Sequence, residues 1–282
     1  NFLFQNDGTG KFEEVGLITG AACDLHGNPQ GSMGVDCGDY NNDGWLDFYQ
    51  TSFQRQHSVL FQNLGDGLLE DVTFLSGAGA GTVAQVTWGN GLVDFDNDGD
   101  RDIFVACGHL HDLVDRFDDT TSYLARNILL MNTGDGKFID VSRAGGDGLS
   151  VKLSSRGAAF DDLDNDGDVD VVILNSRREP TILRNESVSE NHWLQIRLRG
   201  VKTNRDGVGA RVKLAAGELT QMDEVHSGRG YQSHYGTRLH FGLGRHDRID
   251  RIEVRWMGGG VDVLEDLAAD QLLTITEGGT TP

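Results

Sequence analysis

Proline and cysteine are both scarce in this chain, and each scarcity excludes a class of protein. Only 3 of the 282 residues are proline, too few for a linker-rich or collagen-like protein. The three cysteines, Cys23, Cys37 and Cys107, form no Cys-x-x-Cys pair, so zinc sites and thioredoxin-type redox sites have no support. At most one internal disulfide can form. Pairing of Cys23 with Cys37 is left open, and Cys107 is expected to be a buried thiol.

Long apolar runs and familiar catalytic motifs are also missing. No stretch approaches the roughly 20 apolar residues that a bilayer span needs, which predicts a soluble globular protein without a membrane span. Neither Gly-x-Ser-x-Gly nor His-Glu-x-x-His occurs, so the serine hydrolase elbow and the zinc-protease helix are absent. The first residue is Asn and no signal peptide is visible, so we expect a processed product or a fragment.

Positive charge is in deficit, and the deficit is uneven. The formal net charge is −20, which argues against a nucleic-acid partner. Residues 1–186 hold 12 basic and 31 acidic side chains, whereas residues 187–282 hold 12 and 13. The shift in charge predicts two domains, 1–186 and 187–278. The 39 glycines, about twice the usual share, predict many tight turns and therefore much β-structure.

The acidic part contains one segment three times. The copies begin at Asp39 (Asp-Tyr-Asn-Asn-Asp-Gly-Trp-Leu-Asp), at Asp94 (Asp-Phe-Asp-Asn-Asp-Gly-Asp-Arg-Asp) and at Asp162 (Asp-Leu-Asp-Asn-Asp-Gly-Asp-Val-Asp). Hairpin sequences of the form Asn-x-Gly-Asp-Gly follow the first two copies, and residues 3–15 are a further hairpin. With the β-type runs that flank each loop, every unit supplies about four short strands. A four-stranded unit of 40 to 70 residues is typical of a β-propeller blade.

Each loop carries the ligands that a hard cation prefers. Carboxylates at positions 1, 3, 5 and 9 converge because the glycine at position 6 permits a sharp turn, and oxygen ligands at this density suit Ca²⁺. An EF-hand would need a Glu at position 12, where Gln50, Val105 and Ile173 stand instead. A backbone carbonyl at position 7 is the expected sixth donor. The alternative is that Asp and Asn clusters simply favour turns, yet three copies in register would repel strongly without a counter-ion.

We therefore predict about three Ca²⁺ ions, one for each loop. The predicted metal ligands are Asp39, Asn41, Asp43, Trp45 and Asp47; Asp94, Asp96, Asp98, Asp100 and Asp102; and Asp162, Asp164, Asp166, Asp168 and Asp170.

These motifs resemble a known family. The Asp-x-Asp-x-Asp-Gly-x-x-Asp loops resemble FG-GAP/VCBS repeats, the calcium-binding blades of integrin-α-type seven-bladed propellers. Residues 191–200, 204–211, 227–231, 239–244 and 254–256 together resemble an ASPIC/UnbV domain. The combination is similar to the cartilage acidic protein family. That resemblance implies a secreted or cell-surface protein, extracellular or periplasmic, that binds calcium.

The repeats depart from a complete propeller in one respect. A closed ring needs roughly four to eight blades, yet this chain carries three loops and opens with half a blade. We expect either that N-terminal blades are missing from this sequence or that a homo-oligomer completes the ring. The first reading is preferred.

The C-terminal part has its own strand pattern. Apolar and polar residues alternate with period two over residues 194–199, 210–214 and 251–256, which predicts antiparallel strands. About seven such segments predict a small β-sandwich. Its outward arginines, Arg197, Arg199, Arg211 and Arg255, either alternate with acids as solvated surface or offer a face for an anionic glycan or for the acidic propeller.

Two functions are carried forward. The first is an extracellular calcium-stabilised binding or adhesion module with a protein or glycan ligand, and with no catalytic or cofactor site. The second is a propeller-scaffold enzyme acting on acidic polysaccharide, which rests on His109 and His111 with Asp112 and Asp115 nearby. These residues lie in the longest insertion, 108–127, where a binding loop is also plausible on a rigid scaffold.

Overall fold

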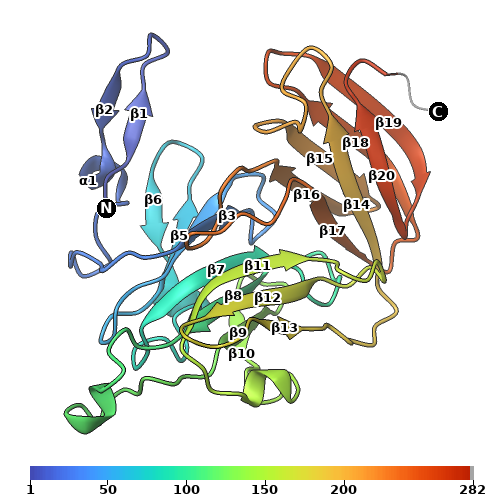
Figure 1. The fold of residues 1–282 in the computed structure, drawn as a ribbon. Helices are drawn as coiled ribbons and strands as arrows, with labels where there is room; N and C mark the ends of the chain where they lie inside the picture. Colours follow the sequence, from blue (N-terminus) through green and yellow to red (C-terminus); the bar gives the residue numbers. More distant parts are fainter. Residues whose placement is uncertain (280–282) are drawn as a thin grey trace.

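The computed structural model describes residues 1–279 and is all-β, as predicted (Figure 1). The strands of the acidic part form an N-terminal hairpin and three larger antiparallel sheets, which we call the first, second and third sheets in chain order. The N-terminal hairpin is β1 (Phe4–Asn6) and β2 (Phe12–Glu14). The first sheet contains β3 (Val35–Gly38), β4 (Asp47–Gln50), β5 (Val59–Asn63) and β6 (Leu69–Asp71). The second contains β7 (Thr87–Val93), β8 (Asp102–Cys107), β9 (Ile128–Asn132) and β10 (Phe138–Asp140). The third contains β11 (Ser155–Asp161), β12 (Asp170–Asn175) and β13 (Thr181–Leu183).

Each of these sheets is built from strands that follow one another in the chain, and within the sheets only the 108–127 insertion between β8 and β9 is a long connection. The acidic loop joins the first two strands of its sheet, so the alternation of β-forming runs with Asp-Asn-Asp-Gly turns fixes the order. Short helical turns follow the last strands: α1 (Gly16–Thr19), α2 (Thr73–Ser76) and the 3-10 turn η2 (Gly148–Ser150). A second 3-10 turn, η1 (Val114–Arg116), lies in the insertion at 108–127.

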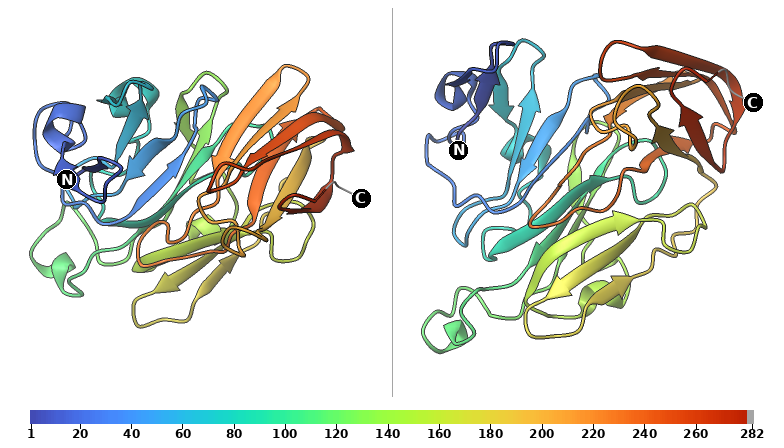
Figure 2. Two further views of the ribbon diagram at one scale, coloured as in Figure 1. Left: turned by 90° about the horizontal axis from the view of Figure 1, so that it is seen from above. Right: turned by 45° about the horizontal axis from the view of Figure 1, so that its top comes forward.

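The first strands of the three sheets lie next to one another. Strand β3 packs on β7 and β7 on β11, so the sheets follow one another in an open arc (Figures 1 and 2). Two apolar clusters fill the spaces between them. One includes Tyr40, Leu92 and Phe138 and joins the first and second sheets, and the other includes Phe104, Phe160 and Val171 and joins the second and third.

The C-terminal part is a sandwich of two sheets, as predicted from the alternating pattern. One sheet has the order β17-β14-β20 and the other β16-β15-β18-β19. Their apolar faces enclose a core in which Leu194, Phe241 and Trp256 are buried. The strands are β14 (His192–Arg199), β15 (Arg211–Ala216), β16 (Leu219–Glu224), β17 (Leu239–Gly244), β18 (Arg248–Arg255), β19 (Val261–Ala268) and β20 (Gln271–Thr276).

The sandwich sits against the arc through the loop between β16 and β17. Gly230 exchanges two backbone hydrogen bonds with Val35 of β3, at 2.9 and 3.3 Å. Tyr231 packs edge-on against Trp88 of β7, and Tyr235 does the same against Phe160 of β11. This one loop therefore contacts the first strand of all three sheets.

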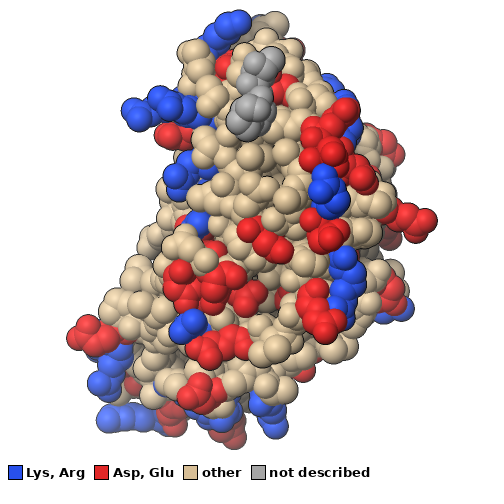
Figure 3. All heavy atoms as spheres, turned by 90° about the vertical axis from the view of Figure 1, so that its right-hand side faces the viewer, with Lys and Arg blue, Asp and Glu red and all other residues tan. Residues whose placement is uncertain are grey.

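The structure tests the sequence-based interpretations of the cysteines and of the sandwich arginines. All three cysteines are free thiols, so Cys23 and Cys37, whose pairing the sequence left open, are unpaired, whereas Cys107 is buried as expected. Arg211 and Arg255 pair with Glu224 and Glu253 of their own sheet, which favours the reading of alternating surface charge. Figure 3 shows basic and acidic side chains interspersed over the face that includes this sandwich. Docking on the acidic sheets uses other arginines, which are described below.

Candidate metal sites and the domain interface

Every acidic loop is held by the same set of hydrogen bonds. The Asp at position 1 accepts the N–H of the glycine at position 6, at 2.8 Å in the first loop, 2.8 Å in the second and 3.0 Å in the third. The Asp at position 5 accepts the N–H of position 7 in each loop. These contacts close the turn around its own carboxylates. The Asn at position 4 has a positive φ, 57°, 60° and 61° in turn, a conformation that Asn tolerates better than most residues.

The Asp at position 9 begins the second strand and ties three segments together. Asp102 accepts the N–H of Phe95 at 2.9 Å and that of Asn132 at 2.8 Å. Asp47 and Asp170 make the equivalent pairs of contacts in their sheets. Position 9 therefore fixes the loop, the second strand and the end of the third strand at one point.

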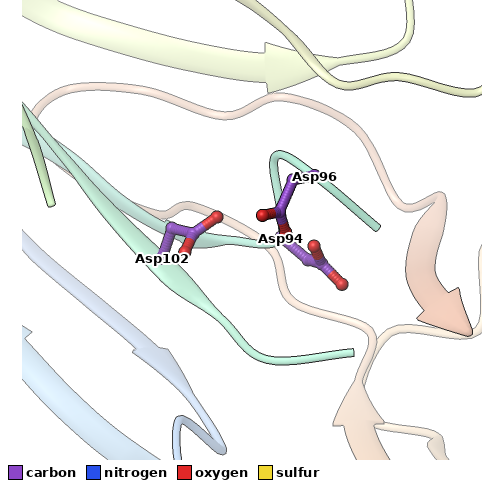
Figure 4. A group of neighbouring side chains, drawn as sticks. All are labelled: Asp94, Asp96 and Asp102. Atoms are coloured by element: carbon purple, nitrogen blue, oxygen red, sulfur yellow. The ribbon is translucent and has the colours of Figure 1, made fainter. Parts of the chain in front are cut away.

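Within residues 1–279, carboxylates converge to metal-binding distance in two of the loops. Asp94, Asp96 and Asp102 place one oxygen each within 4.8 Å of one another, and so do Asp162, Asp164 and Asp166. Figure 4 shows the first of these groups, which comes from the end of β7, the loop and the start of β8. The predicted ligands of the first loop, Asp39, Asn41, Asp43 and Asp47, form no such group of carboxylates.

The second loop fits a cation best. Asp94 Oδ1 and Asp96 Oδ1 are buried and lack any hydrogen-bond partner, so two carboxylate oxygens face the loop interior unsatisfied. Burial, together with the neighbouring carboxylates, raises the pKa of Asp94 and Asp102 well above the usual range. A hard divalent cation with oxygen ligands would satisfy both the orphaned atoms and the crowded charge.

The first and third loops differ in their surroundings. Burial raises the pKa of Asp39 to about 6 and that of Asp47 to about 7. In the third loop Asp164 and Asp166 are exposed, and Arg184 lies 2.8 Å from Asp164 and 3.6 Å from Asp166. A guanidinium therefore already balances part of the third loop's charge.

In the second and third loops the side chain at position 7 accepts a hydrogen bond from the preceding loop, a contact that the ligand pattern did not predict. The Asp100 carboxylate accepts from Asn42 Nδ2 at 2.9 Å, and Asp168 accepts from Asn97 Nδ2 at 2.8 Å. The Asn at position 4 of one loop thus binds position 7 of the next. Trp45 occupies position 7 of the first loop and is half exposed. The recurrence of Asn at position 4 in all three copies was a visible signal for this contact.

The second and third loops also lie beneath the sandwich. Gly244 of β17 donates its N–H to the Asn97 carbonyl, and His240 contacts Asn97 Oδ1 at 2.7 Å. A Cβ on Gly242 would overlap the Asp94 carboxylate. In the third loop, Gln195 of β14 donates to Asp162 Oδ2 at 2.9 Å. Two of the three acidic loops are therefore part of the contact between domains.

Three ion pairs complete this contact, and two of them are buried. Arg229 binds both carboxylate oxygens of Asp36, at 2.6 and 3.0 Å, and Arg101 binds Asp223 at 2.8 Å. Arg238 pairs with Asp161 at 2.7 Å. The arginines that dock the sandwich are thus Arg229 and Arg238, which lie in the β16–β17 connection rather than on the sheet faces, where the sequence offered docking as one alternative for Arg197, Arg199, Arg211 and Arg255.

The histidine group of the insertion does not assemble. His109 is buried beside Phe53, and its Nδ1 accepts the N–H of His111 at 3.0 Å. Asp112 pairs with Arg177, and Asp115 accepts the N–H of Tyr123. The His111 ring lies beside the His109 ring, with the ring centroids 5.8 Å apart. The four residues form no metal-binding group within residues 1–279.

Comparisons with known proteins match both halves of the chain. The FG-GAP-like repeat model matches residues 1–50 and 94–173, and the ASPIC and UnbV model matches residues 200–282. No helix among residues 1–279 is long and apolar enough to cross a membrane.

Curated relatives match over nearly the whole chain. Cartilage acidic protein 1 of Mus musculus is 26% identical over 98% of this chain and 41% of its own length. The Homo sapiens protein is also 26% identical, over 98% and 40%, and the Xenopus tropicalis protein is 25% identical, over 93% and 38%. This chain therefore spans about two fifths of the length of these relatives.

Among solved structures, an Agrocybe aegerita lectin that recognises non-reducing terminal N-acetylglucosamine aligns with a TM-score of 0.33 and 17% identity. The alignment covers 66% of this chain and 46% of the lectin, and a score this low establishes no shared fold. The family assignment rests on the repeat and domain matches. The chain combines FG-GAP-like repeats with an ASPIC and UnbV domain and is homologous to cartilage acidic protein 1.

Proposed function

We propose that this chain is an extracellular, calcium-stabilised binding module with a protein or glycan ligand. The observation that carries the proposal is the second loop, where buried Asp94 and Asp96 oxygens lack partners at the centre of a group of carboxylates. Carboxylate and carbonyl oxygens are the ligands that Ca²⁺ takes in proteins. The homology to cartilage acidic protein 1 supports an extracellular location.

The role of the metal in this proposal is structural. The ligands also hold the starts of strands, since Asp102 anchors both its own loop and the end of β9. Because the second and third loops lie under the sandwich, a bound ion would stabilise the domain contact together with the sheets. Metal that binds only the folded chain stabilises it by mass action.

The proposal favours binding over catalysis. The polysaccharide-enzyme alternative relied on His109 and His111. The His109 ring is buried beside Phe53 and its Nδ1 accepts the backbone N–H of His111. Among residues 1–279 these histidines form no metal-binding group with Asp112 and Asp115. We therefore propose no enzymatic activity.

Calorimetric titration of chelator-stripped protein with calcium, alongside thermal melts, tests the proposal. We expect up to three ions, one for each loop, with the second loop filled most tightly and a higher melting temperature in calcium. Magnesium at the same concentration is the control, because it accepts fewer protein ligands and demands stricter geometry. Absence of binding, with melts unchanged by chelator, would mean that the loops are acidic turns only.

A further inference from the structure

A polar cavity of about 300 Å³ lies where the insertion at 108–127 returns to the second sheet. Its walls come from the end of the insertion, the segment before β7, the turn after β10 and the segment before β11. Three cationic side chains line it, Arg126, Arg143 and Lys152. We propose that this cavity binds the oxyanion of an acidic glycan, either a sulfate ester or the carboxylate of a uronic acid.

The three cations lack carboxylate partners although acids are in large excess around them. Residues 1–186 hold 31 acidic and 12 basic side chains. Two acids of the insertion, Asp112 and Asp118, pair with arginines outside the cavity, at 2.8 and 3.6 Å. Among the described residues none forms an ion pair with the three cations of the cavity. Unpaired cations on the wall of a cavity attract an anion.

Backbone pairing holds two of these cations at neighbouring positions. Ala125 and Leu153 exchange two N–H to C=O hydrogen bonds, at 2.9 and 3.0 Å, as an isolated antiparallel bridge. Arg126 and Lys152 flank this bridge, one on each segment, and both line the cavity. Like charges at adjacent cross-strand positions repel, so a bound anion would relieve the repulsion between them.

The Arg126 guanidinium keeps its outer N–H groups available. Its Nε donates to the Ser150 carbonyl at 3.2 Å, and within residues 1–279 its two Nη groups have no hydrogen-bond partner. A guanidinium presents paired N–H groups in a planar fork that matches two oxygens of a carboxylate or of a tetrahedral oxyanion. The cavity therefore places a bidentate donor beside the Lys152 ammonium, which suits an oxyanion.

The rest of the lining suits a sugar better than an acidic peptide. Gln85 and Asn127 line the cavity with amide groups, and Asn127 Oδ1 already accepts the Cys107 N–H at 3.0 Å, so its Nδ2 is the end left for a ligand. Thr121 adds a buried hydroxyl without a partner, so rotation about its χ1 would break no hydrogen bond of that hydroxyl. Sugar hydroxyls both donate and accept and can pair with all of these groups, whereas the carboxylates of an acidic peptide only accept.

The test follows the fluorescence anisotropy of a labelled tetrasaccharide of alternating uronic acid and sulfated amino sugar. The protein is titrated in at about 0.05 M salt, where exposed charges are weakly screened. We expect saturable binding that Arg126→Gln and Lys152→Gln each weaken about tenfold, because each removes one charge-assisted contact. Arg197→Gln and Lys213→Gln are the matched controls, since they remove exposed cations of the sandwich, and should leave the affinity unchanged.

Asp119 supplies a variant that should gain affinity. Its side chain is exposed and lines the same cavity, so its carboxylate repels an anion bound there. Asp119→Asn should tighten tetrasaccharide binding about two- to threefold, the size of an exposed charge interaction, with an unchanged thermal melt. Because a misfolded protein does not gain affinity, this variant decides the question even if Arg126→Gln does not fold.

Two further probes identify the ligand. If the tetrasaccharide without its sulfates also binds, the carboxylate is the recognised group, and if only the sulfated form binds, the sulfate is; either result supports the inference. A peptide of four glutamates that binds as tightly, and is released by Lys152→Gln, would overturn the choice of a glycan. No saturation at millimolar tetrasaccharide, or equal losses in the sandwich controls, would overturn the site.

The inference rests on the proposed binding function, to which it adds a ligand class and a site, and it requires no bound metal. Each titration is therefore repeated with calcium and with chelator. Calcium that raises the melting temperature while no tetrasaccharide binds in either medium would overturn this inference alone. Tetrasaccharide binding that persists where calcium leaves the melt unchanged would support the inference and contradict only the calcium-stabilised fold.

Discussion

Asn41 and Asp96 occupy position 3 of the first and second loops, and they differ in that Asn41 has a neutral amide where Asp96 has a carboxylate. Asp96 Oδ1 is buried without a partner. We predict that Asp96→Asn weakens calcium binding at the second loop by at least about tenfold, because affinity follows the number of charged ligands. In chelator the same variant should melt higher than the unmodified chain, because repulsion from Asp94 and Asp98 is relieved.

Calorimetry in calcium and melting in chelator check the two halves of this prediction. Asp206→Asn, an exposed acid of the sandwich, is the control and should change neither measurement. Calcium affinity that survives Asp96→Asn would show that the second loop is not the site.

Several carboxyl groups of the loops titrate far above the usual Asp range. Burial is the main cause, and it raises the pKa of Asp98 and Asp168 to about 6 and that of Asp47 to about 7. In the unfolded chain the pKa of Asp is about 3.9, so between about pH 4 and 7 the metal-free folded state holds more protons than the unfolded state. These groups therefore lower the free energy of unfolding as the pH rises through that window.

Calcium would displace those protons, so its stabilising effect should grow from pH 5 to pH 7.5. Urea midpoints measured with calcium and with chelator at each pH check this prediction. Histidines that titrate alike with calcium and with chelator contribute equally to both urea midpoints, so their contribution cancels when one midpoint is subtracted from the other. A difference that stays constant with pH would contradict the assignment of these carboxyls as ligands.

At the scale of the element, the asparagine at position 4 of one loop hydrogen-bonds to the next loop, and we call these contacts the asparagine relay. Asn42 donates to the Gly99 carbonyl at 3.1 Å and to Asp100 at 2.9 Å. Asn165 has the same loop position and the same positive φ, but its side chain is exposed at the end of the arc. We predict that Asn42→Gly lowers the free energy of unfolding by about 1 to 2 kcal/mol, the net worth of these hydrogen bonds.

Asn165→Gly is the matched control for the relay. Both positions have φ near 60°, so glycine is conformationally tolerated at each and its backbone effect cancels in the comparison. Denaturant unfolding should show a clear loss for Asn42→Gly and little change for Asn165→Gly. Equal losses would mean that the relay contributes nothing beyond the turn itself.

The repeats could be predicted from sequence because their signals are local. Asp-Asn-Asp-Gly turns and the apolar runs around β4, β8 and β12 determine sheet order and loop position without long-range information. The convergence of carboxylates in the second and third loops follows from the same spacing. The alternation of residues 194–199 likewise predicted β14.

What sequence reasoning missed depends on contacts between distant segments. Period two identifies which arginines point outward on a strand, but Arg229 lies in an irregular loop and meets Asp36 only after the domains dock. The third sheet has three strands rather than the roughly four that the repeat pattern predicted, because the chain passes from β13 to β14 of the sandwich. Whether Cys23 pairs with Cys37 could not be decided from sequence, because spacing alone does not place two thiols together, and the structure leaves both unpaired.

At the scale of the whole molecule, the domains are held by a buried ion pair at the centre of their contact. Arg229 binds Asp36, whose Oδ2 also accepts from the Tyr235 hydroxyl and from the N–H of Leu92. The Asp36 carboxylate is fully buried, with 0% of its side chain exposed. Removing the arginine leaves that charge buried without its counter-ion, which is far more costly than losing an exposed pair.

We predict that Arg229→Leu lowers the free energy of unfolding by about 3 kcal/mol or more, the usual cost of breaking a buried pair from one side. Adding Asp36→Asn to that variant should recover part of the loss, because the uncompensated charge is then gone. Arg245→Leu, which removes an exposed pair with Glu190 in the same domain, should cost less than about 1 kcal/mol. Denaturant unfolding of the four proteins decides the matter. Equal losses for the two arginines, or no recovery in the double variant, would mean that loop packing and not this ion pair holds the sandwich on the sheets.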